Sequence, residues 1–267
     1  MKLFLKILFI ITWVALVAGA VVLMSFANKS HNLQRCTGIT VTVDYRDGEQ
    51  LVTPEILKSQ LQKEFGKFEN KLLGDISVDQ VNAFLRKNQY LDNSDVHLSV
   101  EGQLVANVTQ CNPVLRITTM ENKNYYIDSN GKIMLADPKF PVRIVVANGL
   151  IGLGNKPQGK NLASFFERKK KIAPELLNLN KAFKVSLALA NDSVMKALTE
   201  QIYVTADGVV TILTKTGSHK VILGDATDLE EKFVKLLTFY KQGLPKVGWA
   251  KYKSINLAYK NQVICSK

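Results

Sequence analysis

Residues 7–27 read ILFIITWVALVAGAVVLMSFA, and this stretch determines how the rest of the chain is organised. It contains no charged side chain. At about 1.5 Å per residue, a helix of this length covers roughly 31 Å, close to the hydrocarbon thickness of a bilayer. Lipid offers the backbone no hydrogen-bond partners, so a segment of this kind crosses a membrane as a helix. The sequence therefore predicts a cytoplasmic stub at residues 1–6 and a transmembrane helix at residues 7–27.

The same residues allow a second interpretation, a cleaved secretory signal. Lys2 and Lys6 would form its basic start, and Ala18-Gly19-Ala20 has the small-x-small form of a cleavage site. The apolar run continues beyond the length that a signal core needs, which favours a retained anchor. Both interpretations export the rest of the chain, so we expect the function to belong to the exported part.

The composition indicates a folded, basic protein. Hydrophobic residues make up 46% of the 267 residues, and the net charge is +12. The surplus lysines are scattered, as on an ordinary solvated surface. The alternative is that the lysines contact anionic lipid or a cell-wall polymer. The same two interpretations apply to the basic run at residues 168–171. The exported address argues against nucleic acid as a partner.

After a linker at residues 28–36, residues 37–112 predict a small domain with the order strand, helix, helix, strand, strand. Thr53 and Pro54 are typical of a first helix start, and Ser77 followed by Gln80 is typical of a second. We expect a three-stranded sheet with both helices on one face.

Three cysteines, Cys36, Cys111 and Cys265, are too few for a disulfide scaffold and match no zinc spacing. Cys36 precedes the first strand of this domain and Cys111 follows the last. If these two strands run antiparallel and pair, a disulfide would join the two cysteines. Three buried free thiols are the alternative.

Residues 113–267 predict a mostly antiparallel β domain with flanking helices, so that the whole chain belongs to the α+β class. A helix near residues 229–240 carries an apolar stripe and is expected to stop at Gly243 and Pro245. The last two predicted strands, 254–259 and 262–266, end the chain and are expected at a sheet edge that could accept a foreign strand. Lysines beside them could equally blunt that edge.

No catalytic pattern is present. His31, His97 and His219 lie far apart in the sequence, and no nucleophile or metalloenzyme motif accompanies them. The sequence therefore predicts a protein that is not an enzyme, with no catalytic residue, cofactor or metal site.

The organisation resembles the FtsQ/DivIB family of bacterial cell-division proteins, which have a short cytoplasmic tail, one span, a POTRA domain and a β domain. The pattern of residues 39–108 is similar to the POTRA domain. The β-domain cues are Tyr126-Ile127-Asp128-x2-Gly131, Ile222-Leu223-Gly224, the helix at residues 229–240 and the closing Ile255-Asn256-Leu257-Ala258-Tyr259. Ala258 stands where the family commonly has Arg.

The resemblance implies a bitopic scaffold of the divisome in the bacterial plasma (inner) membrane, with its N-terminus cytoplasmic and its bulk periplasmic. It implies that the chain links and regulates the septal peptidoglycan machinery and binds small bitopic proteins like FtsB/DivIC and FtsL, by strand addition at the closing strands. The predicted contact residues are Ser254, Leu257, Tyr259, Asn261, Gln262 and Val263. An envelope transport or assembly chaperone with a POTRA-like module, or a secreted cell-wall protein, is the alternative. The sequence contains no internal repeat, which argues against the chaperone.

Overall fold

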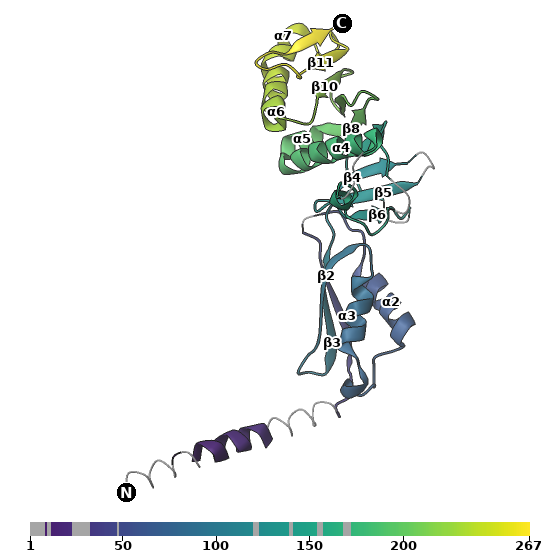
Figure 1. Cartoon of the computed structure of the whole chain (residues 1–267), viewed down its shortest axis with the longest axis vertical. Coiled ribbons are helices and arrows are strands. Elements are labelled where there is room, and N and C mark those ends of the chain that lie inside the picture. Colours follow the sequence, from purple (N-terminus) through teal and green to yellow (C-terminus); the bar gives the residue numbers. More distant parts are fainter. Residues whose placement is uncertain are drawn as a thin grey trace. The chain divides into compact units, whose positions relative to one another are not determined.

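The computed structural model describes residues 9, 12–22, 33–46, 48–119, 123–138, 141–153, 157–167 and 172–267. The chain divides into two compact units, which Figure 1 shows in blue and in green to yellow. The first comprises the chain up to Asp44 together with Val52–Gln110, and the second comprises Tyr45–Leu51 and Cys111–Lys267. Sheets and helices are mixed in the chain, which confirms the predicted α+β class.

The predicted membrane span at residues 7–27 lies partly outside the described residues. Residue 9 and residues 12–22 of it are described, and they are helical. Within the described part of the chain, no helix has both the length and the apolar character that crossing a bilayer requires. The stub at residues 1–6, most of the linker and the basic run at residues 168–171 also lie outside the described residues.

The first unit contains a three-stranded sheet and two main helices. The Thr53 side chain accepts a hydrogen bond from the Ile56 N–H, and the Ser77 side chain accepts one from the Gln80 N–H, so both helices begin where the sequence predicts. The elements, in chain order, are β1 (Gly38–Asp44), α2 (Pro54–Phe65), the 3₁₀ turn η1 (Leu73–Asp75), α3 (Val78–Arg86), β2 (Leu91–Leu98) and β3 (Gln103–Gln110).

The direction of β3 contradicts the prediction for this sheet. The strand order is β1-β3-β2, and β1 pairs with β3 in parallel, with Gly38 opposite Gln103. The helical crossover ends in β2 on the far side of β3, and the hairpin then returns β3 parallel to β1. Cys36 and Cys111 therefore lie at opposite ends of the paired strands, about 20 Å or more apart at ~3.3 Å per residue. The predicted disulfide between them is wrong: both cysteines are buried and neither forms a disulfide.

The second unit is built on a nine-stranded sheet with the order β12-β11-β10-β9-β8-β7-β4-β5-β6. Three neighbouring pairs, β4–β7, β7–β8 and β10–β11, are parallel, and the other five are antiparallel. The strands are β4 (Pro113–Thr118), β5 (Asn124–Asp128), β6 (Ile133–Leu135), β7 (Val146–Gly149), β8 (Thr199–Val204), β9 (Val210–Thr214), β10 (Lys220–Gly224), β11 (Ser254–Asn256) and β12 (Ile264–Ser266).

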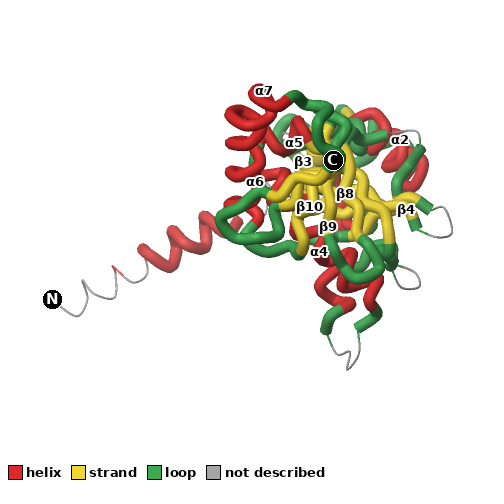
Figure 2. The backbone as a smooth tube through the Cα atoms, turned by 90° about the horizontal axis from the view of Figure 1, so that it is seen from above, coloured by secondary structure: helices red, strands yellow, loops and turns green. Residues whose placement is uncertain are grey.

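Helices make two of the three crossovers that the parallel pairs require, and the connection from β4 to β7 contains the strands β5 and β6. Helices α4 (Pro174–Asn191) and α5 (Ser193–Leu198) join β7 to β8. Helix α6 (Leu229–Thr238), the π-helical turn η3 (Phe239–Gly243) and α7 (Leu244–Val247) join β10 to β11. A further 3₁₀ turn, η2 (Leu162–Phe165), lies between β7 and α4. Figure 2 shows α6 and α7 along one side of the strands that lead to the C-terminus. One apolar core unites the helices and the sheet, so the last strands are held by tertiary packing.

Candidate protein-binding site

The two outer strands of the nine-stranded sheet differ in how their free sides are treated. On β6, the Ile133 N–H donates to the Lys160 carbonyl at 2.9 Å, and the Gly159 N–H donates to the Ile133 carbonyl at 2.8 Å, so the 157–162 segment covers this edge. On β12, pairing with β11 occupies one side, and no described strand lies on the other. The final strand thus lies at a sheet edge, as predicted, and it is the more open of the two edges.

Two of the predicted contact residues, Ser254 and Leu257, are buried, because β11 is not an edge strand. It pairs with β10 in parallel and with β12 antiparallel. The Leu257 side chain has no exposed surface and Ser254 is only 9% exposed, because both pack inside the domain. Neither can meet a partner while the domain stays folded.

The other four predicted residues lie in or beside the turn between β11 and β12. Tyr259 is 51% exposed, Asn261 and Gln262 are exposed, and Val263 is half-buried. Asn261 has a φ of 57°, a left-handed conformation that asparagine tolerates in tight turns. These four side chains are available for contact.

A groove of about 630 Å³ lies between this turn and the α6–α7 helices. Asn261, Gln262 and Val263 form its strand side, and α6 contributes Val234 and Lys235. Val234 is 64% exposed because it falls outside the stripe of Phe233 and Leu236 that packs on the core. Figure 1 shows α6, α7 and β11 grouped at the C-terminal end of the second unit. The structure therefore brings three predicted residues together with helix residues that the sequence did not identify.

Lys235 ties the helix side of the groove to the turn. Its Nζ donates to the Tyr259 carbonyl at 3.0 Å and lies 3.6 Å from Glu231 Oε1, and the Lys235 side chain is 17% exposed. A charged donor in a partly buried setting makes a stronger hydrogen bond than a neutral one. Lys235 thus positions Tyr259, a role that no sequence motif signalled.

The helical side of the groove extends further than predicted. Gly243 and Pro245 do not stop the helix, because η3 and α7 continue it and Pro245 occupies the first turn of α7, where a missing N–H costs little. A Cβ added to Gly243 would lie 2.5 Å from Cδ2 of Phe239. The glycine therefore allows Phe239 to fold back against the backbone in the π-helical turn that lines the groove.

The charge of the groove is positive. Lys235 and Lys246 line it together with a single carboxylate, that of Glu231. Within the edge strand β12, burial raises the pKa of the Cys265 thiol, so that this thiol stays protonated at neutral pH. The surface combines a free strand edge, apolar side chains and lysines, which suits an extended segment with apolar and acidic side chains.

The described residues were also compared with the ligand sets that metal ions require. No group of three or more His, Cys, Asp or Glu residues among them is placed to hold a metal ion. The absence of enzyme activity stays a prediction.

Comparison with known proteins identifies the second unit. Residues 112–266, more than half of the chain, match the family described as FtsQ/DivIB, C-terminal related. The matched range includes the β12 edge and every residue that lines the groove. No curated protein matches the chain.

Proposed function

The chain belongs to the FtsQ/DivIB, C-terminal related family, and we propose that it serves bacterial cell division by binding another protein at the β12 edge. The match agrees with the resemblance seen in the sequence. The observation that carries the proposal is the open side of β12 next to a groove with apolar and basic side chains.

The proposed mode of binding is strand addition. A partner segment would pair with β12, about 4.8 Å away, so that its backbone satisfies the free N–H and C=O groups of the edge. Ile264, which is 42% exposed, would meet apolar side chains of the added strand. Because β12 has only three residues, backbone pairing alone is short, and the groove would supply the remaining contacts.

The groove would determine which segment is accepted. Apolar partner side chains would pack against Val234 and Phe239, and acidic ones would lie near Lys235 and Lys246. Ala258 carries no charge, whereas the family that the sequence resembles commonly has Arg at this position. A Cβ on Gly224 would lie 2.9 Å from the Ala258 Cβ, so position 258 lies close against β10. The lysines of the groove would therefore carry the charged part of the contact.

The finer part of the proposal concerns the setting. We propose a bitopic scaffold of the divisome, anchored in the bacterial plasma membrane by residues 7–27, with the chain from residue 28 onward outside. Its partners would be small bitopic proteins like FtsB/DivIC and FtsL, and it would act by linking the septal peptidoglycan machinery rather than by catalysis. The apolar sequence of residues 7–27 and the family membership support this setting.

Site-directed photocrosslinking in dividing cells tests the proposal. A photoreactive residue at Ile264 or Val234 should capture a small bitopic membrane protein. The same residue at Leu135, on the covered β6 edge and with a similar exposure of 36%, should not. Equal capture at Ile264 and Leu135, or no midcell localisation of a fluorescent fusion, would contradict the proposal.

A further inference from the structure

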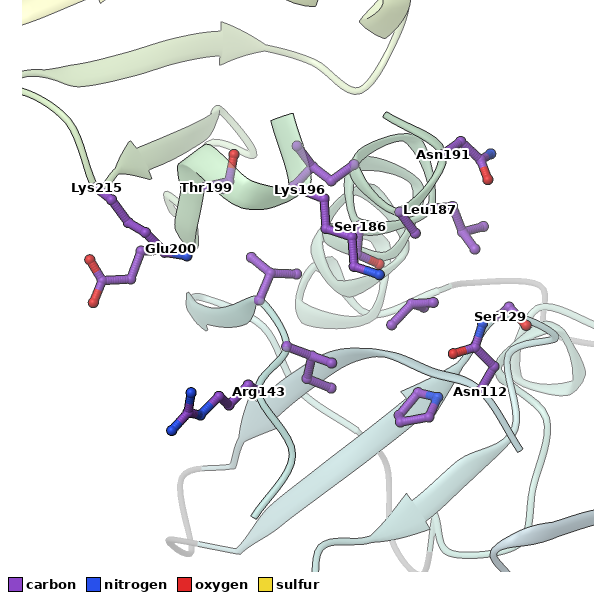
Figure 3. A pocket seen from close by; sticks show the side chains of 16 residues that line it. Asn112, Ser129, Arg143, Ser186, Leu187, Asn191, Lys196, Thr199, Glu200 and Lys215 are labelled. Carbon is purple, nitrogen blue, oxygen red and sulfur yellow. The ribbon is translucent and has the colours of Figure 1, made fainter. Parts of the chain in front are cut away.

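A second hollow in the second unit has the features of a small-molecule site. It has a volume of about 410 Å³ and lies between the C-terminal half of α4, α5 and the beginnings of β4 and β8 (Figure 3). Ligand sites in proteins typically measure roughly 300–1,000 Å³. The cavity shares no lining residue with the groove beside β12. It is therefore a separate feature that protein binding at the edge does not use.

The lining of this cavity carries excess positive charge. Arg143, Lys196 and Lys215 line it against a single carboxylate, that of Glu200. None of the three basic side chains forms an ion pair or a side-chain hydrogen bond with any residue that the structure describes. In Figure 3 the Lys196 side chain extends toward the space between α4 and the strands, whereas the Glu200 carboxylate points away from that space. Unpaired cations around a cavity favour an anionic occupant.

Two buried hydroxyl groups add to the polar lining. Ser186 is 1% exposed and donates to the Phe183 carbonyl at 2.8 Å, so its oxygen lone pairs remain free. Thr199 is 4% exposed, and its Oγ1 has no hydrogen-bond partner among the described residues. The Thr199 oxygen has almost no accessible surface, so the head group of a ligand would be met by the basic side chains rather than by this hydroxyl.

The remaining lining is apolar. Pro113, Val145, Leu187 and Leu189 contribute to it, so a ligand that consisted only of a charged group would leave part of the cavity unfilled. We propose that this cavity binds a small anion with a short apolar tail, whose head group is a carboxylate or a phosphate monoester. Lys196 and Lys215 hold the head group, and the leucines of α4 contact the tail.

Titration calorimetry on the full chain in a neutral detergent tests this site with three probes: hexanoate, hexyl phosphate and hexanol. At least one of the two anions should bind with a stoichiometry of one. Hexanol should bind at least about tenfold more weakly, because it lacks the charge that Lys196 meets. A tighter fit of hexanoate identifies the head group as a carboxylate, and a tighter fit of hexyl phosphate identifies it as a phosphate.

Three variants show whether the anion sits in this cavity. Lys196→Met should weaken anion binding about tenfold or more, the loss of one charge-assisted hydrogen bond. Lys184→Met changes an exposed lysine of α4 outside the cavity and should leave the affinity unchanged within about twofold. Lys215→Met provides a second cavity variant. Lys196 and Lys215 are exposed, so both variants should keep the unfolding temperature of the parent chain.

Several results would overturn the proposal. One is the absence of saturable binding of either anion up to about 10 mM, since a specific small-ligand site should bind more tightly than that. Another is equal weakening by Lys196→Met and Lys184→Met, which would indicate general attraction to a basic surface. Hexanol that binds as tightly as hexanoate would also overturn it.

Discussion

Removing the Tyr240 hydroxyl should destabilise the second unit, because that oxygen joins three buried side chains. His219 Nε2 lies 2.6 Å from the Tyr240 oxygen, which lies 3.1 Å from Thr214 Oγ1. Thr214 donates to the Thr216 carbonyl at 2.9 Å, so it accepts from Tyr240, and Tyr240 in turn accepts from a protonated Nε2. The network thereby assigns the Nε2–H tautomer to His219.

The size of the effect follows from what Tyr240→Phe leaves behind. The ring and its packing against Trp249, with centroids 5.2 Å apart, remain in place. The change leaves a buried N–H donor on His219, which is 2% exposed, without its acceptor and deprives Thr214 of its donor. Each unsatisfied buried polar group costs about 1–3 kcal/mol. We therefore expect a loss of about 2–4 kcal/mol in the free energy of unfolding.

Urea unfolding followed by Trp249 fluorescence measures this loss. The chain has two tryptophans, so a Trp13→Phe background isolates the signal of Trp249. Tyr203→Phe is the matched control, because Tyr203 is 45% exposed and water can replace any partner of its hydroxyl. A loss for Tyr240→Phe no larger than that of the control, at an unchanged urea slope, would refute the assigned network.

Three further predictions concern the same region. Burial lowers the pKa of His219, so below about pH 6.5 the unfolded chain binds more protons than the folded chain. The free energy of unfolding should therefore decrease from pH 6.5 toward pH 5 by up to ~1.4 kcal/mol per pH unit. The variant His219→Phe should show a smaller decrease in urea titrations. Gly243→Ala should cost about 1–3 kcal/mol in the same titrations, because the new methyl group displaces Phe239, and crosslinking from the groove should weaken with it. Lys235→Met should leave the free energy of unfolding within about 1 kcal/mol of the parent. It should nevertheless reduce crosslinking from Ile264, because the Tyr259 carbonyl loses its hydrogen bond to α6. Undiminished crosslinking would show that this hydrogen bond does not shape the site.

Local features of the sequence were enough to predict where several helices and strands begin. Thr53 and Ser77 cap helices that begin where predicted, because a cap depends only on side chains within three residues of the helix start. The hairpin of β5 and β6 is determined as locally, because the Asp128 carboxylate accepts from the N–H groups of Asn130 and Lys132 within the turn itself. The order of elements and the β domain cues were enough to identify the FtsQ/DivIB resemblance, which the family match confirms.

Which strands pair and which side chains remain exposed depends on contacts between segments that are distant in the sequence, so neither could be predicted from the sequence. Alternation of apolar and polar residues shows that a segment is a strand, but not which strand lies beside it or in which direction. For this reason the order of helices and strands along the chain did not reveal that β1 pairs with β3 in parallel, which separates Cys36 from Cys111. The same holds for Leu257, buried by contacts from distant elements, and for Lys235, whose partner lies 24 residues away. The binding edge and both cavities are formed by segments far apart in the sequence, so their shape exists only once those segments have packed together.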